Sequence, residues 1–443
     1  MTKYNKEFFQ NKIILAPMVR MNTLPFRLLA LDYGADIVYS EEIIDHKLLK
    51  NMLDTIDYID TSDGSLIFRT CSREKNKIIF QIGTSDAERA AQAASIIEND
   101  VAGIDVNMGC PKHFSVSGGM GAALLSNISK ASNIIQQIRN KVNVPITCKI
   151  RILENDQETI NFCKVMKENG VSAIAVHGRT VKERPYHRNR NSVIANIAKT
   201  VTVPIIANGG SNTIETYEDI IKFKADTNCS SVMLARSAQN NPSVFRKSGK
   251  LPLDEVIKSF LKYAIHFDNC FPNTKYCIQS MLKELQNTPK GKLFLESQNL
   301  EEICDLWNLG EIYHQKENEF KSKGLHFQCD ILFNHQRKKF KSNLDSVLTL
   351  HCSFIRSKFT LDSDLPKNVL LKYSQKYKNA APKYQTKHTD KLFQSTVTFN
   401  NQKYSSTFWE KNKKSAEQGA AIVCLCYLKV YNETELKSKG III

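Results

Sequence analysis

A cysteine directly follows a short apolar run in this sequence and stands just before a glycine-rich stretch. Cys110 comes three residues after Asn107 in Val-Asn-Met-Gly-Cys-Pro, and residues 117–125 read Ser-Gly-Gly-Met-Gly-Ala-Ala-Leu-Leu. A thiol placed where a strand gives way to a loop can reach a substrate. Because a cysteine thiol is mostly protonated at neutral pH, it can act there as a general acid. The alternative is a small buried thiol that packs as a hydrophobic side chain.

Further residues able to bind a ligand stand at or just after the ends of other apolar runs. The candidates are Pro17, Met18, Gln81, Lys149, Arg151, His177, Arg179, Asn208, Gly209, Gly210, Ala235 and Arg236. Amide, ammonium, imidazole and guanidinium groups gathered at one place suit an anionic, heteroaromatic ligand. Lys149 could instead extend into water from a strand end, and His177 could be a hydrogen-bonded core residue.

The spacing of these runs predicts strands that alternate with helices. Apolar, β-branched segments followed by amphipathic stretches occur at 13–18, 36–41, 78–83, 103–109, 145–151, 173–178, 204–210 and 231–236. Nearly continuous apolar strands separated by helices indicate a parallel sheet that is covered on both faces. Eight such units predict an α/β fold, the (β/α)8 TIM barrel. A doubly wound sheet is the alternative, but the first strand lacks the G-x-G-x-x-G turn typical of that fold.

In a TIM barrel the carboxyl ends of all strands meet at one mouth, so the candidate residues should lie together there. Asn208-Gly209-Gly210 follows the seventh run and Ala235-Arg236 follows the eighth. Barrels commonly bind phosphate through backbone N–H groups after these two strands. The sequence therefore predicts a phosphate site here, with a simple turn as the alternative for the two glycines.

The chain divides into four predicted segments. Residues 1–245 form the barrel, and 246–329 show helical spacing only, which predicts a small all-α domain. Residues 330–362 are irregular and basic, which suggests a linker. Residues 363–432 read as helix, three strands and helix, an α+β domain. Within the barrel, residues 55–69 carry the signature of a hairpin inserted at the rim.

Composition limits the class of protein. The chain has 443 residues, a hydrophobic fraction of 42% and a formal net charge of +16. We find no apolar run of signal-peptide or membrane-span length and expect an intracellular protein that does not bind membranes. Twelve irregularly spaced cysteines fit free thiols in a reducing compartment and form no metal knuckle. A cytoplasmic location is expected, with the nucleus as the alternative, and no feature indicates an obligatory protein partner.

Positive charge is concentrated near the C-terminus. Residues 361–443 contain 14 lysines and no arginine against seven acidic residues. Such an excess suits a polyanionic partner. The candidate phosphate-binding side chains are Lys367, Lys372, Lys413 and Lys414. Lys413 and Lys414 stand at the start of the second predicted helix of this domain.

Six ordered motifs resemble those of the tRNA-dihydrouridine synthase family. They are Pro17-Met18-Val19, Gln81-Ile82-Gly83, Asn107-Met108-Gly109-Cys110-Pro111, Cys148-Lys149-Ile150-Arg151, His177-Gly178-Arg179-Thr180 and Asn208-Gly209-Gly210. The resemblance covers residues 13 to about 330. The Gly118–Gly121 loop, Asn273-Thr274-Lys275-Tyr276-Cys277 and the basic terminal domain are similar to the eukaryotic type 2 branch, whose extra module is a double-stranded RNA-binding domain.

The resemblance implies reduction of the C5–C6 double bond of a uridine in tRNA, at D-loop position 20. It implies FMN, reduced by NADPH or NADH, with hydride passing to C6 and Cys110 protonating C5. Lys149 would contact both flavin and substrate, and Asn107 and Arg179 would contact the uracil. The implied cofactor-binding residues are Pro17, Met18, Val19, Gln81, Lys149, His177, Asn208, Gly209, Gly210, Ala235 and Arg236.

The sequence departs from the family pattern at two places. Ala235-Arg236 stands where many relatives have Gly-Arg, and His388-Thr389-Asp390 is short and lacks the Gly-Pro-x-His loop usual in double-stranded RNA-binding domains. Two other functions stay open at this point. One is an FMN barrel that acts on a free dihydropyrimidine or dihydroorotate, and the other is a non-catalytic RNA-binding protein on a barrel scaffold.

Overall fold

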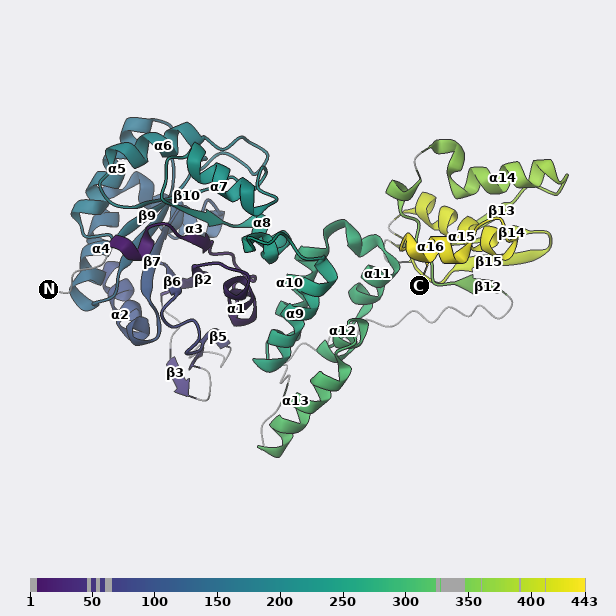
Figure 1. The fold of residues 1–443 in the computed structure, drawn as a ribbon, viewed down its shortest axis with the longest axis horizontal. Coiled ribbons are helices and arrows are strands. Elements are labelled where there is room, and N and C mark those ends of the chain that lie inside the picture. The colour runs from purple at the N-terminus through teal and green to yellow at the C-terminus, as the bar shows by residue number, and fades with distance from the viewer. Residues whose placement is uncertain are drawn as a thin grey trace. The chain divides into compact units, whose positions relative to one another are not determined.

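The computed structural model describes residues 6–45, 49–52, 56–59, 66–323, 327, 347–359, 361–389, 392–410 and 412–442. The chain forms two compact units (Figure 1). One consists of Met1–Met281 and Glu311–Ile331, and the other of Leu282–Gly310 and Leu332–Ile443. Among the described residues, no helix combines the length and the apolar character that crossing a bilayer requires.

Eight parallel strands of the first unit close into a barrel in the order β1-β11-β10-β9-β8-β7-β6-β2, which confirms the predicted TIM barrel. Their bounds are β1 (Ile13–Leu15), β2 (Ile37–Ile44), β6 (Ile78–Gly83), β7 (Gly103–Met108), β8 (Ile146–Arg151), β9 (Ala173–His177), β10 (Ile205–Asn208) and β11 (Ser231–Leu234). All eight coincide with the apolar runs. The strands are buried on both faces, which is why they show no polar alternation.

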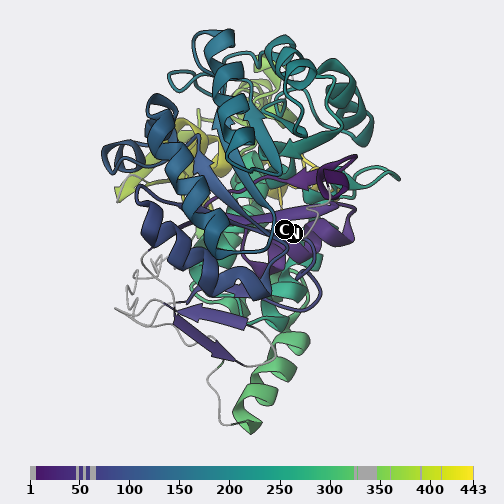
Figure 2. The same ribbon diagram turned by 90° about the vertical axis from the view of Figure 1, so that its left-hand side faces the viewer.

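Helices surround the barrel strands (Figure 2). They are α1 (Leu24–Asp32), α2 (Ala87–Ile97), α4 (Ile128–Lys141), α5 (Asp156–Glu168), α6 (Asn191–Thr200), α7 (Tyr217–Asp226) and α8 (Arg236–Asn240). Local sequence sets their ends. The Asn127 side chain accepts the Lys130 N–H at the start of α4, and Thr216 and Asp219 form a capping box on α7. α2, α4, α5 and α7 thus each begin at a residue whose side chain accepts a free backbone N–H.

A small antiparallel sheet is inserted between β2 and β6. It consists of β3 (Leu49–Met52), β4 (Ile56–Ile59) and β5 (Leu66–Thr70), and Tyr58 pairs with Phe68. The predicted hairpin is therefore present, with a third strand added to it. The predicted turn at residues 62–64 lies outside the described residues.

The predicted helical domain is shared between the two units. In the first unit, α9 (Leu253–His266) packs on α1 through the rings of Phe260 and Phe26, and α10 (Phe271–Leu282) and α13 (Gly310–Ser322) follow. The second unit takes η5 (Lys283–Asn287), α11 (Pro289–Glu296) and α12 (Leu300–Leu306). The single helix expected over 300–319 is broken at Asn308, whose φ of 56° is left-handed. The helical spacing of apolar residues predicted where the helices lie in the sequence. It did not predict which other elements they pack against.

The second unit contains a four-stranded sheet in the order β12-β15-β14-β13. Its elements are β12 (Val347–Leu350), α14 (Pro366–Lys376), β13 (Lys383–Thr389), β14 (Leu392–Phe399), β15 (Gln402–Ser406), α15 (Lys413–Tyr427) and α16 (Glu433–Ser438). Residues 347–350 were assigned to a linker, and that assignment is wrong for them. Leu348 and Leu350 pack on the core of this unit, so the segment is a strand parallel to β15. Residues 330–346 lie outside the described residues.

An ion pair joins α11 to the sheet of the second unit. Lys292 Nζ lies 2.6 Å from Glu410 Oε1, and both side chains are largely buried. The same ammonium lies 5.6 Å from the ring centroid of Phe408. Removal of either charge would leave the other buried without a partner. The pair therefore determines which surface of α11 packs on the sheet.

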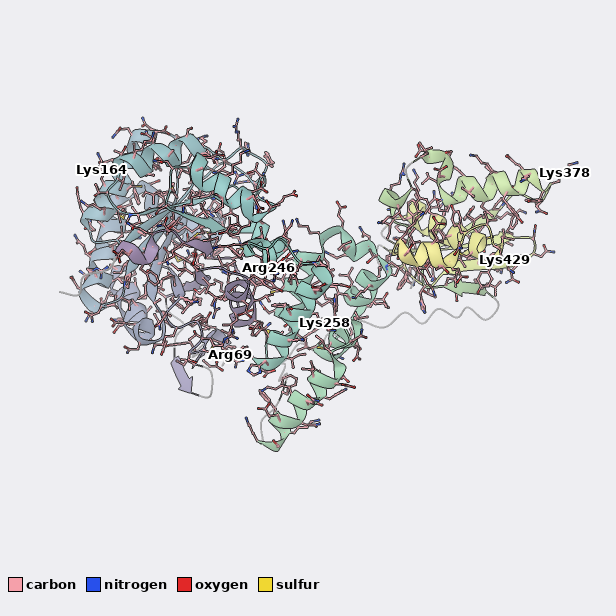
Figure 3. The ribbon with its side chains drawn as sticks, in the orientation of Figure 1. Arg69, Lys164, Arg246, Lys258, Lys378 and Lys429 are labelled. Carbon is pink, nitrogen blue, oxygen red and sulfur yellow. The ribbon has the colours of Figure 1, made fainter. Side chains whose placement is uncertain are left out.

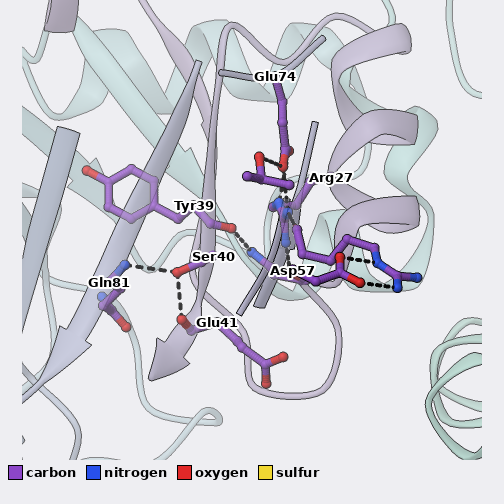
Figure 4. A network of polar contacts seen from close by, with 10 residues as sticks. Arg27, Tyr39, Ser40, Glu41, Asp57, Glu74 and Gln81 are labelled. Carbon is purple, nitrogen blue, oxygen red and sulfur yellow. Dashed lines mark hydrogen bonds and ion pairs between the residues drawn. The ribbon is translucent and has the colours of Figure 1, made fainter. Parts of the chain in front are cut away.

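A buried arginine links α1 to the segment between β5 and β6 (Figure 4). Arg27 Nη2 lies 2.5 Å from Glu74 Oε1, and the two side chains are 1% and 0% exposed. Arg27 also donates to the carbonyls of Asn22 and Arg69, and Thr70 Oγ1 donates to Glu74. Because every strong donor and acceptor is satisfied, the pair is tolerated in the core.

We expect Arg27→Met to lower the free energy of unfolding by about 3–5 kcal/mol, because it leaves the Glu74 carboxylate buried without a partner. The matched control is Arg73→Met, whose guanidinium pairs with Asp32 at 2.9 Å but is 53% exposed. That exposed pair should contribute no more than about 1 kcal/mol. Urea unfolding followed by far-ultraviolet circular dichroism measures both. Equal effects of the two substitutions would contradict the assignment.

Candidate active site at the barrel mouth

The side chain of Asn107 holds the turn that carries Cys110. Asn107 Oδ1 accepts the backbone N–H groups of Gly109 and Cys110, each at 3.0 Å, and its amide nitrogen donates to Gln81 Oε1 at 3.3 Å. The sequence analysis assigned Asn107 to the uracil. In the structure these hydrogen bonds hold the backbone of the turn that presents the cysteine.

The glycine-rich loop fixes the same cysteine from the other side. It contains α3 (His113–Ser117) and η3 (Gly121–Ser126), and the Ala122 N–H donates to the Cys110 carbonyl at 3.0 Å. Gly121 has a φ of 56°, and a Cβ there would stand 2.5 Å from Ser115 Oγ and 2.7 Å from the Cys110 carbonyl. Only glycine fits, so the loop can close tightly on the turn. Cys110 itself remains partly accessible.

A carboxyl group that the sequence analysis missed lies beneath this turn. Asp105 on β7 is fully buried, and it accepts hydrogen bonds from Gln81 Nε2 at 2.7 Å and Thr147 Oγ1 at 2.6 Å. Burial raises the pKa of Asp105 to about 6, against the opposing effects of these hydrogen bonds and of Lys149. An aspartate inside an otherwise apolar strand was the signal that could have revealed it.

Lys149 lies beside the cysteine turn. It is the β8 partner of Asn107 in the sheet register. Burial, followed by the charge of Arg151, lowers the pKa of Lys149 to about 8, while Asp105, Cys110 and Glu42 act in the opposite direction. The Lys149 ammonium and the Cys110 thiol therefore lie at the same barrel mouth, as expected for residues at the carboxyl ends of neighbouring strands.

Cations dominate the side of the mouth formed by β8 and β9. Burial, followed by the charges of Lys149, Arg151 and Arg179, depresses the pKa of His177 well below its usual value, so its imidazole is neutral at pH 7. Arg151 donates to the carbonyls of Gly109 and Thr180, at 3.0 and 2.9 Å.

Arg179 does not point free donors at a substrate. It is 2% exposed, and its guanidinium donates to the carbonyls of His187, Gly209 and Pro185 and lies 3.0 Å from His177 Nε2. Its assignment to the uracil is therefore not supported by this structure. The arginine instead holds the loop after β9 against the loop after β10.

The ends of β10 and β11 form a backbone cradle that neighbouring side chains pack against closely. Gly209 has a φ of 112°, and a Cβ there would stand 2.1 Å from Asn189 Oδ1. Asn208 donates to the Met233 carbonyl at 2.8 Å, which ties β10 to β11. Burial lowers the pKa of the Arg236 guanidinium, which follows β11 directly. Gly210 is buried beside this cradle, and Ala235 is half-buried before α8.

The remaining predicted cofactor residues lie in the turn after β1. Pro17 and Met18 are half-buried, and Val19 is 45% exposed. The buried amide of Asn22 donates to the carbonyls of Ala16 and Tyr39, at 2.7 Å each, and so joins this turn to β2. Figure 4 shows the adjoining part of the network, in which Ser40 contacts Gln81.

Three of the predicted RNA-binding lysines gather at the N-terminal ends of α14 and α15. Lys367 forms an ion pair with Glu417 and lies 4.7 Å from the ring centroid of Tyr384. Lys413 lies 3.9 Å from Glu417 and is 68% exposed, and Lys414 is exposed. The fourth, Lys372, donates to the Ser363 carbonyl at 3.4 Å. Lys413 and Lys414 are thus the more accessible charges, and Lys367 is partly neutralised within the protein.

Comparison with known proteins agrees with this architecture. The sequence profile of the family described as Dihydrouridine synthase (Dus) matches residues 14–327, which include the barrel and most of the following helices. The chain belongs to the dihydrouridine synthase family. A second profile, described as Double-stranded RNA binding motif, matches residues 366–428, from α14 to α15. The family assignment is therefore confirmed, as are the barrel and the double-stranded RNA-binding motif that the sequence predicted after it.

Several members of the dihydrouridine synthase family are similar to this chain. The tRNA-dihydrouridine(20) synthase of Schizosaccharomyces pombe is 39% identical over 291 residues, which cover 62% of this chain and 60% of that protein. The Saccharomyces cerevisiae protein of the same name is 36% identical over 299 residues, covering 62% and 78%. A crystal structure titled tRNA-dihydrouridine(20) synthase dsRBD domain is 43% identical, with a TM-score of 0.18, over 18% of this chain and 88% of that one.

The lowered pKa of Lys149 has a consequence for stability. Below a pH of about 8 the folded protein holds Lys149 in its charged form, which burial disfavours, and this lowers the free energy of unfolding. The loss disappears as the pH rises toward 10.5, the ordinary pKa of lysine, because the lysine is then neutral in the folded state. We expect Lys149→Met to raise the free energy of unfolding at pH 7 by about 3 kcal/mol, because each unit by which the pKa is lowered corresponds to about 1.4 kcal/mol. The gain should shrink steadily between pH 8 and pH 10.

Urea unfolding of the protein without added cofactor at pH 7 and pH 9.5 checks this expectation. The matched control is Lys164→Met on α5, an exposed lysine (Figure 3), which should change stability little at either pH. A destabilised Lys149→Met protein, or a gain that does not depend on pH, would contradict the argument.

Proposed function

We propose that this protein reduces the C5–C6 double bond of a uridine in tRNA to dihydrouridine, with FMN as cofactor, NADPH or NADH as electron donor and Cys110 as proton donor. The observation that carries the proposal is the meeting of the Cys110 thiol and the Lys149 ammonium in one barrel mouth. Family membership supports the reaction. The names of the similar yeast proteins, which specify position 20 and NAD(P)+, support the substrate uridine and the donor.

The residues present suit FMN. A phosphate needs hydrogen-bond donors that the protein does not already engage. The hydroxyl of Ser237, directly after Arg236, is buried and has no partner among the described residues. Gly209, Gly210, Arg236 and Ser237 would hold the phosphate, and Gln81, Lys149 and His177 would hold the ring system. Pro17, Met18, Val19, Asn208 and Ala235 would border it.

The chain's own residues explain the proposed chemistry. When bound, reduced FMN supplies a hydride to C6 of the uracil, which places negative charge on C5 and the C4 oxygen. Asn107 and the Gly121 loop hold Cys110 so that its S–H can transfer a proton to C5. Lys149 supplies a positive charge that stabilises the anionic forms on either side of this step. The neutral His177 can donate or accept a hydrogen bond without adding a further charge.

The second unit supports an RNA substrate over a free pyrimidine. A double-stranded RNA-binding motif with exposed lysines at Lys413 and Lys414 serves no purpose for a small molecule. The β13–β14 hairpin pairs up to Thr389 and Leu392, which leaves room for two residues only. Such a short connection cannot reach far into a minor groove, so we assign RNA contact to the lysines and not to this turn.

Eleven cysteines of the described residues are free thiols, which fits a reducing compartment, and we infer the cytoplasm as the site of action. Detection of the protein in the nucleus alone would contradict this location.

We expect Cys110→Ala to retain bound flavin and its reduction by NADPH, and to lose at least about 100-fold of its activity on tRNA, because the general acid is removed. Flavin absorbance measures the first two properties. Mass spectrometry of nucleosides from treated tRNA measures the third, as one uridine heavier by two hydrogens.

The matched control is Cys270→Ala, which replaces an exposed cysteine at the start of α10. It should leave the yield of dihydrouridine unchanged. Full activity of Cys110→Ala would refute the acid assignment. A wild-type protein that reduces free uracil or orotate and leaves tRNA unchanged would refute the proposed substrate in favour of a small-molecule enzyme.

We expect the double substitution of Lys413 and Lys414 by alanine to weaken tRNA binding and to lower the slope of log affinity against log salt by about 1.4–1.8, the value for two lost phosphate contacts. The Asn412 side chain, which caps α15, is retained, so the helix should stay folded. The control removes the same charge from Lys437 and Lys439, exposed residues of and beside α16. The affinity for tRNA is measured for wild type and both double variants between 50 and 200 mM salt. If the Lys413/Lys414 variant has the same salt slope as the Lys437/Lys439 control, the assignment is wrong.

A further inference from the structure

Glu42 is a titratable group in the mouth to which the mechanism above gives no role. A register shift between Tyr39 and Glu42 in the pairing of β2 with β6 brings Glu42 opposite Gln81. Its carboxyl lies over the end of β6, because a Cβ on Gly83 would stand 2.7 Å from Glu42 Oε1. The bulge therefore directs an acidic side chain toward the strand ends that carry Gln81 and Asn107.

The Cys110 thiol and the Asn107 amide are neighbours of the Glu42 carboxyl, and both favour its ionised form. Its Oε1 atom is buried and has no partner among the described residues. A buried carboxylate oxygen without a donor is costly, and a neutral carboxyl tolerates the position better. Burial accordingly raises the pKa of Glu42. The arrangement favours a carboxyl that holds a proton next to a thiol.

Neighbouring charges keep this proton transferable. Lys112, after the cysteine, and Lys149, on β8, both favour the ionised carboxylate, whereas burial disfavours it. Burial is the largest of these effects and raises the pKa of the carboxyl, so Glu42 can hold a proton to give. Both Glu42 and Cys110 are partly accessible, so water can reach the carboxyl once a product has left.

We propose that Glu42 returns a proton to Cys110 after each turnover. This inference rests on the proposed function. In the first step the S–H bond of Cys110 breaks, and its proton forms the new C–H bond at C5 of the uracil. The resulting thiolate then takes the proton of the Glu42 carboxyl, and the carboxylate that remains takes a proton from water. One proton thus enters from solvent for each proton given to C5, and no further reactant is needed.

The test separates the first turnover from later ones. In wild type and Glu42→Gln, the flavin is reduced beforehand and the enzyme is mixed in excess over tRNA. Cys110 is already protonated, so the rate of this single turnover should agree within about twofold. With excess tRNA and NADPH, Glu42→Gln should turn over at least about tenfold more slowly, since general acid groups contribute effects of this size or larger.

Two further variants exclude a merely structural effect. Glu41→Gln is the neighbouring control, because Glu41 Oε2 accepts the Arg20 N–H at 3.0 Å and a glutamine oxygen can still do so. Its steady-state rate should stay within about twofold of wild type. Glu42→Ala leaves space for a small acid, so added formate should raise its steady-state rate and should not raise that of Glu42→Gln.

Three results would overturn the proposal. They are an unchanged steady-state rate in Glu42→Gln, an equal loss in the single-turnover and steady-state rates, and an absence of formate rescue in Glu42→Ala. A wild-type protein that forms no dihydrouridine would refute the proposed function itself, and the role of Glu42 would fail with it. The wild-type measurement therefore separates the two failures.

Discussion

Closure of the barrel between β1 and β11 is the constraint on which the rest of the structure depends. Ile13 pairs with Val232, and Ser231 Oγ accepts the Lys12 N–H at 3.0 Å, so the first and last strands are joined. Parallel strands in a closed ring must all end at one rim. Residues far apart in the chain, such as Cys110 and Gly209, are thereby directed to one rim, which no local interaction could achieve.

The mouth that closure creates has two electrostatic halves. Carboxyl groups of Glu42 and Asp105 lie on the side of β2 and β7, and the cations of β8 to β11 lie across from them. Lys149 is placed between the two groups, and its pKa reflects both. The phosphate of the proposed FMN would lie on the cationic side, where its negative charge is favoured.

The second unit consists of an apolar core with lysines at its surface. Its core is formed by apolar residues of α14, α15 and the sheet, and it leaves lysines at the helix ends. Glu417 neutralises Lys367 and only partly screens Lys413, so the accessible positive charge is smaller than the lysine count suggests. Lys292 and Glu410 attach α11 to this unit, which explains why the chain's helical segment does not form one separate domain.

The sequence by itself determined the eight strands, the family and the strand ends that carry Cys110, Lys149 and Gly209. Buried parallel strands are continuous apolar runs, and their polar ends stand out against them. Only the tertiary structure decided how these ends are used. Asn107 and Arg179, which were expected at the substrate, form hydrogen bonds within the protein, and a register shift places Glu42 opposite Gln81. Hydrogen-bond partners and strand register depend on neighbours distant in the chain, which residue spacing does not record.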